Sequence, residues 1–406
     1  MKEKSVLRAT QAIIHLDALR RNIQAAREKA GPHPKLCVPV KANAYGHGAV
    51  AVSRCALDAG AEYLGVATVA EGAELRAARI GAPVFLLSQP LPQELADIVA
   101  LELTPFVSDG DFIDSTARAA AAAGRLTVHL KIDTGMGRLG CRPEEAAALA
   151  AKIASSRTLT LGGVATHLSV SDSPDPDDIA YTKEQLRRFR EAAASIKAAG
   201  IEPGLLHAAN SGGLVFHEDS YFDMIRPGIF LYGYSPAGSV PAEPVMELRS
   251  ALSAIKKIKK GEAVSYGRTW VAPQDTYIGV IPAGYADGLP RLLSNNYSVS
   301  IRGKAYPLVG RICMDQCMVN LGATPEVRRW EQVVLFGGGF TSAAGIAEKV
   351  NTISYEVVCK ISERVPRVYE HGNSIGLHGN QFSKIGEILP RSFTEGRGVS
   401  RRKKED

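Results

Sequence analysis

The chain has 406 residues, of which 45% are hydrophobic and 22% are charged, an ordinary globular composition whose length suggests two domains or one barrel with an appendage. The formal net charge is +6, and half of it lies in residues 371–406, which hold seven Lys or Arg and four Asp or Glu. The charge that remains in residues 1–370 is too small to predict a nucleic-acid-binding surface.

Residues 1–16 are basic and lack an apolar stretch of signal-peptide length, and no segment approaches the ~20 apolar residues of a transmembrane helix. The cysteines are scattered, and several lie in apolar runs, which indicates buried free thiols in a reducing compartment. Their spacing is not that of a zinc site. We therefore expect a cytoplasmic protein without a metal, a membrane anchor or a nucleic-acid partner. The six cysteines are Cys37, Cys55, Cys141, Cys313, Cys317 and Cys359.

Short apolar strands alternate with Ala-, Glu- and Arg-rich helices over residues 12–240. Eight such units are the arithmetic of a (β/α)8 TIM-type barrel. A Rossmann sheet is the alternative, but no Gly-x-Gly-x-x-Gly opens a helix after an early strand. The predicted strands are 36–40, 63–68, 84–88, 105–108, 127–132, 159–167, 204–207 and 224–230, and the helices between them include 69–80, 144–155 and 178–199.

A strand at 12–16, followed by a helix at 17–30, is surplus to the count of eight. This strand is free to pair with a second domain, and the preceding segment 1–11 is a candidate for the same domain.

The pattern changes after a Pro- and Gly-containing linker at 235–244. Short β-branched strands then predict a mostly antiparallel β domain over 241–370. The run of three glycines at 337–339 is interpreted as a turn, and residues 371–406 as a basic, disordered tail. The predicted strands are 245–258, 276–282, 297–302, 317–321 and 332–336.

Lys41 lies in the run VPVKANAYGHG, residues 38–48, at the end of a predicted strand and before a glycine-rich turn. A lysine amine at the mouth of a parallel strand can form a Schiff base with an aldehyde cofactor once a low-polarity site lowers its pKa. For a lone lysine, a surface side chain with a buried stem is the better interpretation. The accompanying Tyr45, Gly46 and Gly48 have no reason to follow such a lysine, so the run favours chemistry.

Four more polar motifs end predicted barrel strands, the edge where barrel enzymes build active sites. They are KIDTGMGR (131–138), TH (166–167), HAANSG (207–212) and RPGI (226–229). Alone, His167 is more often a core histidine, and Asn210 with Ser211 and Gly212 is an ordinary helix cap. Together on one rim, these motifs predict an active site. The motifs of the last two barrel units, 207–212 and 226–229, offer small residues and backbone N–H groups to a phosphate.

The run at 38–48 closely resembles the pyridoxal-phosphate lysine motif of alanine racemases, and the resemblance extends from about residue 12 to about residue 369. AVSYGR (263–268) resembles the family's catalytic-tyrosine motif. AGYADG (283–288) and GRICMD (310–315) resemble its substrate-pocket segments, and ISYE (353–356) its phosphate-binding tyrosine. The resemblance implies an enzyme that interconverts L- and D-alanine with pyridoxal 5'-phosphate and supplies D-alanine for peptidoglycan. It also implies a head-to-tail homodimer in which each barrel mouth is completed by the partner's β domain.

The resemblance implies that Lys41 and Tyr266 are the two bases, one on each face of the substrate Cα. A phenol ordinarily has a pKa of about 10, so Tyr266 needs nearby positive charge, for which His167, Arg226 and Arg138 are candidates. The implied cofactor-binding residues are Lys41, Tyr45, His167, Asn210, Ser211, Arg226, Gly228, Ile229 and Tyr355. The implied substrate-binding residues are Arg138, Tyr266, Tyr285, Met314 and Asp315.

Arg226 resembles the arginine that faces the pyridine nitrogen of the cofactor, and His167 resembles the histidine beside the ring that is linked to this arginine. A guanidinium keeps its proton, so the ring becomes a weaker electron sink, which should limit side reactions. Lys131 matches a lysine that is often carbamylated in the family, and a carbamate would anchor Arg138 by charge-assisted hydrogen bonds.

The chain departs from the family's sequence pattern at two places, and three alternative functions are considered. HLSVSD (167–172) is looser than the family's His-Phe-Ala-Thr-Ala-Asp, and the chain continues past the family's usual end near Tyr369. One rival is a racemase of broader or different specificity, although Tyr266 and Tyr355 would crowd all but the methyl group of alanine. A pyridoxal-phosphate-binding regulatory barrel would lack the β domain with its Tyr266 and Met314 segments. An inactive structural barrel would not need both candidate bases.

Overall fold

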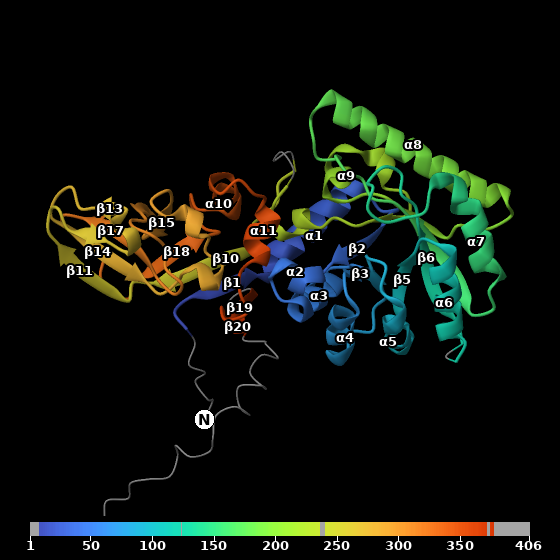
Figure 1. Cartoon of the computed structure of the whole chain (residues 1–406), viewed down its shortest axis with the longest axis horizontal. Helices are drawn as coiled ribbons and strands as arrows, with labels where there is room; N and C mark the ends of the chain where they lie inside the picture. The colour runs from blue at the N-terminus through green and yellow to red at the C-terminus, as the bar shows by residue number, and fades with distance from the viewer. Residues whose placement is uncertain (1–7, 123, 236–239, 372–373, 377–406) are drawn as a thin grey trace, which may run out of the picture.

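The computed structural model describes residues 8–122, 124–235, 240–371 and 374–376. The molecule is elongated, with an α/β domain at one end and a mostly β domain at the other (Figure 1). The expected disordered tail beyond residue 376 and the first seven residues lie outside the described residues.

The first domain contains the predicted eight-stranded parallel sheet, in the order β8-β7-β6-β5-β4-β3-β2-β9. Backbone hydrogen bonds from Asp223 N to Leu206 O (3.0 Å) and from Arg226 N to Ala209 O (2.9 Å) join its two edges into a near-barrel. The predicted TIM-type fold is thus confirmed. The strands are β2 (Lys35–Pro39), β3 (Tyr63–Val66), β4 (Val84–Leu86), β5 (Leu103–Val107), β6 (Leu126–Lys131), β7 (Leu159–Ala165), β8 (Leu205–His207) and β9 (Met224–Ile225).

Several barrel strands end earlier than predicted, because the chain leaves the sheet where the polar rim residues begin. β7 stops at Ala165, before Thr166 and His167, and β9 stops before Arg226. These residues therefore lie on turns at the carboxyl edge of the sheet rather than inside it.

Helices surround this sheet, and their starts carry recognisable caps. Thr68 and Glu71 form a capping box at α4, Asp109 caps α6, and Asp175 caps α8 with Pro176 in the first turn. The helices are α1 (Leu16–Ala30), α2 (Lys41–Tyr45), α3 (Ala49–Asp58), α4 (Val69–Ala77), α5 (Leu95–Ala100), α6 (Gly110–Ala120), α7 (Ala146–Ser155), α8 (Pro176–Ala198) and α9 (Ser211–Phe216).

The second domain is built on a seven-stranded sheet in the order β16-β15-β18-β10-β1-β19-β20, with smaller β11-β14-β17 and β12-β13 sheets. Its strands are β10 (Met246–Ala251), β11 (Ala254–Ile258), β12 (Ala263–Val264), β13 (Trp270–Val271), β14 (Thr276–Ile281), β15 (Ser298–Ile301), β16 (Lys304–Pro307), β17 (Cys317–Gly322), β18 (Gln332–Phe336), β19 (Arg367–His371) and β20 (Ser374–Gly376). The second domain also contains two helices, α10 (Ala343–Lys349) and α11 (Ser354–Cys359). Of these, α11 lies on the side of the barrel, next to α2 (Figure 1).

The prediction of a single strand over 245–258 is wrong. The backbone changes partners in its middle, where Leu252 N bonds to Glu331 O (3.0 Å) and Ser253 N bonds to Val280 O (2.8 Å). The two halves, β10 and β11, therefore belong to different sheets.

The surplus strand β1 (Gln11–His15) pairs with the second domain, antiparallel to β10 and parallel to β19. From β1 in the sheet of the β domain, the chain thus enters the barrel through α1 and returns to that sheet after the barrel.

Asn22 on α1 holds the segment by which the chain leaves the barrel and returns to the β domain. Its side chain is 2% exposed; its amide donates to Leu231 O (3.0 Å) and Glu243 O (2.8 Å), and its oxygen accepts from Glu243 N (2.8 Å). One buried amide therefore joins α1, the end of the barrel and the segment that leads to β10.

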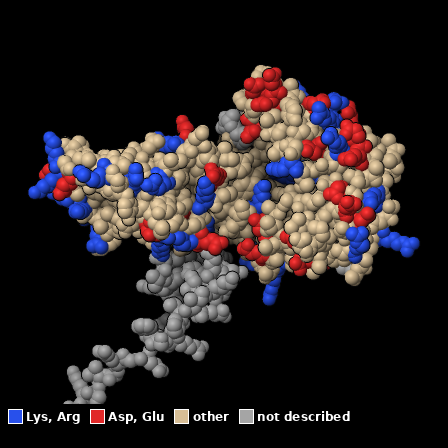
Figure 2. Space-filling model, viewed as in Figure 1, with Lys and Arg blue, Asp and Glu red and all other residues tan. Residues whose placement is uncertain are grey.

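All six cysteines are free, as predicted, and four of them are buried. No helix in the described part of the chain combines the length and the apolar character needed to cross a membrane. On the face drawn in Figure 2, basic and acidic side chains are intermixed over the barrel domain.

Replacing Asn22 with Leu should lower the free energy of unfolding by about 3 kcal/mol, because buried backbone groups at Leu231 and Glu243 lose their partners. Chemical denaturation measures this effect. Gln24→Leu, at an exposed position on the same helix, is the control and should change stability by less than about 0.5 kcal/mol. Equal losses in the two variants would contradict the role of Asn22.

Candidate active site

Lys41 begins a turn with an unusual backbone. Residues 42–45 all have φ between 52° and 54°, and residues 42–44 have ψ between 48° and 53°, so the chain makes a short left-handed turn. None of the four is glycine, and each L-residue in this conformation costs about 1–2 kcal/mol. Strain of this kind persists only where the surroundings impose it.

Four contacts hold this left-handed turn. Glu71 accepts from Ala42 N (2.7 Å), Asn43 accepts from Ala49 N (2.8 Å), and buried His47 donates through Nδ1 to Ala44 O (3.0 Å) and Tyr45 O (2.9 Å). Gly46 packs so closely on the carbonyl of Val358 in α11 that a Cβ would collide with it. The turn is therefore fixed from the barrel side and from the β-domain side.

Lys41 is half-buried, and this burial lowers the pKa of its amine, with a further lowering from the charge of Arg138. Glu71 and the thiol of Cys359 act in the opposite direction. A lowered pKa increases the fraction of neutral amine, which is the form that attacks a carbonyl carbon.

Hydroxyl and backbone N–H groups converge beside Lys41. Tyr45 stacks on Tyr232, with ring centroids 4.7 Å apart, and lies 5.9 Å from the ring of Tyr355 on α11. A Cβ at position 228 would lie 2.6 Å from the Tyr45 hydroxyl, so glycine is required there. Ser211 Oγ accepts from Gly228 N (2.9 Å), which brings the starts of α9 and the following turn together.

The Asn210 side chain is already engaged within the fold. It accepts from Gly213 N (2.9 Å) as the cap of α9, accepts from Ser171 Oγ (2.7 Å), and donates to Leu168 O (3.1 Å). The neighbouring Ile229 is buried at the start of the 3-10 turn Ile229–Tyr232.

Arg226 is bonded to His207 rather than to His167. Its Nη1 donates to His207 Nδ1 (2.5 Å), and its Nη2 donates to Thr166 O (2.8 Å) and Ala208 O (3.2 Å). The expected link to His167 is thus replaced, because Arg226 follows the strand beside β8, whereas His167 follows β7. No role was predicted for His207 from the sequence. Its place at the end of a predicted barrel strand, like that of His167, was the signal that could have identified it.

A second histidine continues this network. His129 Nδ1 lies 2.8 Å from His207 Nε2, and both rings are buried. Since Arg226 can only donate, His207 Nδ1 must accept, so its Nε2–H donates to His129. Burial lowers the pKa of His207 well below its usual range and that of His129 to about 3, so both stay neutral. Burial lowers the pKa of Arg226 to about 10, which leaves its charge intact near neutral pH.

Lys131 is 5% exposed, and its amine lies 5.6 Å from the centre of the Phe106 ring. Burial, followed by the charges of Arg226 and Arg138, lowers its pKa well below the usual range. Burial and the same neighbouring cations lower the pKa of His167. The rim therefore holds two lysines of lowered pKa, Lys41 and Lys131, near the guanidinium charges of Arg138 and Arg226.

The loop that carries Arg138 is anchored beneath its exposed tip. Asp133 accepts from the N–H groups of Gly135 (2.9 Å) and Gly137 (3.1 Å). From α8, Tyr181 donates to Gly135 O (2.8 Å), and buried Gln185 donates to His167 O (3.2 Å). Arg138 is thus presented on the same rim as Lys41.

A second cluster lies in the β domain. Tyr285 N bonds to Cys313 O (3.0 Å), next to Met314, and Ser265 Oγ, next to Tyr266, bonds to Arg311 O (2.6 Å). Asp315 is paired with Arg364 (2.6 Å). Tyr266, Tyr285 and Met314 are 71%, 43% and 53% exposed, so the described chain leaves all three largely uncovered.

The two clusters lie in different parts of the molecule, and Tyr355 on α11 is the β-domain side chain in the first of them. Lys41, Tyr45, Ser211, Gly228 and Tyr355 meet at the barrel rim. Tyr266 follows β12 and precedes β13, which lies at the end of the molecule away from the barrel helices (Figure 1).

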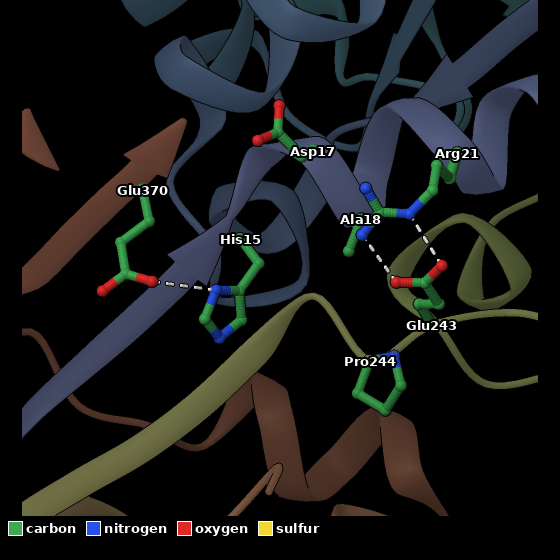
Figure 3. Close-up of a pocket in the computed structure, with 7 residues that line it drawn as sticks. All are labelled: His15, Asp17, Ala18, Arg21, Glu243, Pro244 and Glu370. Carbon is green, nitrogen blue, oxygen red and sulfur yellow. Dashed lines mark hydrogen bonds and ion pairs between the residues drawn. The ribbon is translucent and has the colours of Figure 1, made fainter. Parts of the chain in front are cut away.

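A polar pocket of about 330 Å³ lies elsewhere, between the start of α1 and the segment that precedes β10 (Figure 3). Its charged side chains are paired: Arg21 donates to Glu243 (2.7 and 2.6 Å), and His15 lies 3.1 Å from Glu370. None of the predicted site residues lines it. Its lining residues are His15, Asp17, Ala18, Arg21, Glu243, Pro244 and Glu370.

Replacing exposed Ala42 with Gly should raise the free energy of unfolding by about 1 kcal/mol, because glycine adopts the left-handed conformation without steric cost. The control, Ala151→Gly on the exposed face of α7, should lower stability by about 1 kcal/mol. Thermal or chemical unfolding measures both changes. A loss of stability in both variants would mean that the turn is not strained.

Both domains match known protein sequences. Residues 14–236 match the alanine racemase N-terminal domain, and residues 245–369 match the alanine racemase C-terminal domain. The alanine racemase of Treponema denticola is 46% identical over 374 residues, covering 89% of this chain and 98% of that protein. The protein from Treponema pallidum is 44% identical, covering 88% of this chain and 98% of its own.

Solved structures agree with these sequence matches. Alanine racemase from Clostridium difficile superimposes with a TM-score of 0.87 at 33% identity, covering 92% of this chain and 98% of its own. The enzyme from Streptomyces coelicolor gives a TM-score of 0.83 at 38% identity, covering 91% of this chain and 99% of its own. With both family domains matched in order along most of its length, this chain belongs to the alanine racemase family.

Proposed function

We propose that this chain is an isomerase that interconverts L-alanine and D-alanine, with pyridoxal 5'-phosphate held at the barrel rim. The observation that carries the proposal is Lys41, a half-buried lysine of lowered pKa at the start of the turn that leads to Tyr45, where hydroxyl and N–H groups converge. The implied role is the supply of D-alanine for cell-wall peptidoglycan, in the cytoplasm.

The rim residues fit this cofactor. Tyr45, Ser211 and Tyr355 would offer hydroxyls and Ile229 a backbone N–H to a phosphate, with Gly228 giving the room that the Tyr45 hydroxyl needs. The Gly228 N–H, which donates to Ser211 Oγ here, would exchange that bond for one to the phosphate. Arg226 presents a fixed guanidinium for a ring nitrogen, and His167 and Asn210 complete the wall. When bound, pyridoxal phosphate links to an amino acid and withdraws electrons from Cα, which makes the Cα–H bond acidic.

Two side chains then handle the proton. We assign Lys41 Nζ to one face of Cα and Tyr266 Oη to the other, so that one group removes a proton and the other delivers one. His207 accepts a hydrogen bond from Arg226 without taking its proton, because burial lowers the pKa of His207 far below that of Arg226. The guanidinium therefore stays a donor throughout, as the resemblance to the family implies.

Residues of the barrel rim and of the second cluster would contact the substrate together and determine which amino acid binds. Arg138 and the Met314 backbone are suited to a carboxylate, with Asp315 held beside Met314 by Arg364. Tyr266 and Tyr355 would leave room for little more than a methyl group, which favours alanine over larger amino acids.

Lys131 is suited to carbamylation, because a neutral amine is the form that reacts with carbon dioxide and burial lowers its pKa. A carbamate would turn a buried cation into an anion within the field of Arg138 and Arg226. It would thereby orient Arg138 towards the substrate.

We further propose a head-to-tail homodimer of chains with a barrel at 12–240 and a β domain at 241–370. The uncovered Tyr266, Tyr285 and Met314 of one chain would close the barrel mouth of its partner. Two composite sites related by a two-fold axis follow from this arrangement.

Borohydride reduction of the protein with bound pyridoxal phosphate should attach the cofactor to the peptide that contains Lys41, as mass spectrometry can show. Lys41→Ala should lose this covalent adduct, because the amine that would bind the aldehyde carbon is removed. Lys35→Ala, at the exposed start of β2, the strand that precedes Lys41, is the control and should keep the adduct. An adduct on another lysine would refute the assignment.

Mixing inactive Lys41→Ala and Tyr266→Phe chains should restore about one quarter of wild-type activity after subunit exchange. Half of the dimers are then mixed, and each mixed dimer has one intact composite site. Lys41→Ala mixed with the Lys41→Ala/Tyr266→Phe double variant is the matched control and should stay inactive. If mixed dimers form and bind cofactor yet remain inactive, the sites are not shared.

A further inference from the structure

Ser265, directly before Tyr266, has a backbone conformation that residues with a side chain rarely adopt. Its φ is 66° and its ψ is −176°, a region populated almost only by glycine. Residues with a Cβ avoid it because that atom crowds the backbone. A serine in this conformation must be held there by its neighbours.

The Ser265 hydroxyl makes the contact that holds it. Oγ donates to Arg311 O (2.6 Å), and Cys313 Sγ lies 3.4 Å away on the same segment. Gly310 allows this approach, since a Cβ there would lie 2.9 Å from the Ser265 Cβ and 2.6 Å from Val264 O. The loop of Tyr266 is thus attached to the segment that leads to Met314.

The side chain of Tyr266 cannot fix its own direction. It is 71% exposed, so packing within the chain constrains it little. The backbone on both sides is unusual instead: Gly267 has φ 71° and Arg268 has φ 49°. Val264 and Trp270 are paired, so they fix the two ends of this turn. The backbone conformation of the residues between them therefore determines the direction of the Tyr266 phenol.

We propose that Ser265 is a positioning residue: its hydroxyl bond to Arg311 O holds the glycine-like backbone that aims Tyr266 at the substrate Cα. The inference rests on the proposed role of Tyr266 as a base. It also implies that the base and the Met314 backbone move as one unit, because both are attached to the Arg311 segment.

The strain itself is tested by comparing Ser265→Ala with Ser265→Gly. Both variants lose the hydroxyl, and only alanine keeps a Cβ. In an ordinary turn or strand alanine is at least as stable as glycine. Here the glycine variant should unfold at the higher temperature. A higher unfolding temperature for the alanine variant would overturn the claim of strain.

The positioning role is tested by exchange of the Cα hydrogen of each alanine enantiomer with D2O. Tyr266→Phe should slow exchange from the enantiomer that Tyr266 deprotonates more than from the other. Ser265→Ala should slow the same enantiomer about tenfold or more, since a small misplacement of a reacting group costs this much. Exchange from the enantiomer served by Lys41 should stay within about twofold. The absorbance of the bound cofactor should not change.

Ser253→Ala is the matched control. It removes a similar hydroxyl-to-carbonyl bond in the same domain, from Ser253 Oγ to Val280 O (3.0 Å), away from Tyr266. It should leave the ratio of the two exchange rates unchanged.

Equal slowing of both enantiomers in Ser265→Ala, with the asymmetry preserved in Tyr266→Phe, would show a merely structural role and overturn the inference alone. An absence of asymmetry in Tyr266→Phe would instead overturn the base assignment, and the positioning role with it. Ser265→Gly, which has no steric reason to misfold, gives the same readout if the alanine variant folds poorly.

Discussion

The strained left-handed turn after Lys41 is the constraint on which the rest of the site depends. Four non-glycine residues with φ near +50° carry Lys41 and Tyr45 to one rim, and Glu71, Asn43 and His47 hold them there. The large barrel core and the seven-stranded sheet supply the stability that offsets this strain. Ser265, next to Tyr266, also has a positive φ, so both candidate bases lie next to residues in unfavourable backbone conformations.

Electrostatics complement this geometry. A row of buried groups, Arg226, His207 and His129, carries a single positive charge, on Arg226, because both histidines are neutral. That charge contributes to the lowered pKa of Lys131 and of His167. One guanidinium thus influences several rim groups, and its own donors are fixed by carbonyls and by His207.

The sequence was sufficient to predict the barrel, the surplus strand and the rim motifs, because apolar periodicity and the polar residues that end each strand are local signals. It did not predict the break between β10 and β11, which depends on where β14 and β18 offer partners. The Arg226 link was expected at His167 from the resemblance to the family. The order of the predicted barrel strands already places His207 on the strand next to Arg226, a signal that the prediction did not use. The positive φ of Ala42 and Ser265 had no sequence signal, because neither is glycine.

The most direct measurement of the central claim, that two different groups serve the two faces of Cα, is the isotopic content of the first product formed in D2O. Starting from protiated L-alanine, the account predicts that D-alanine carries deuterium at Cα from the first turnovers, because the group that delivers the proton is not the one that removed it. D-Alanine that retains the original hydrogen would indicate a single base that returns the same proton, and would contradict the account.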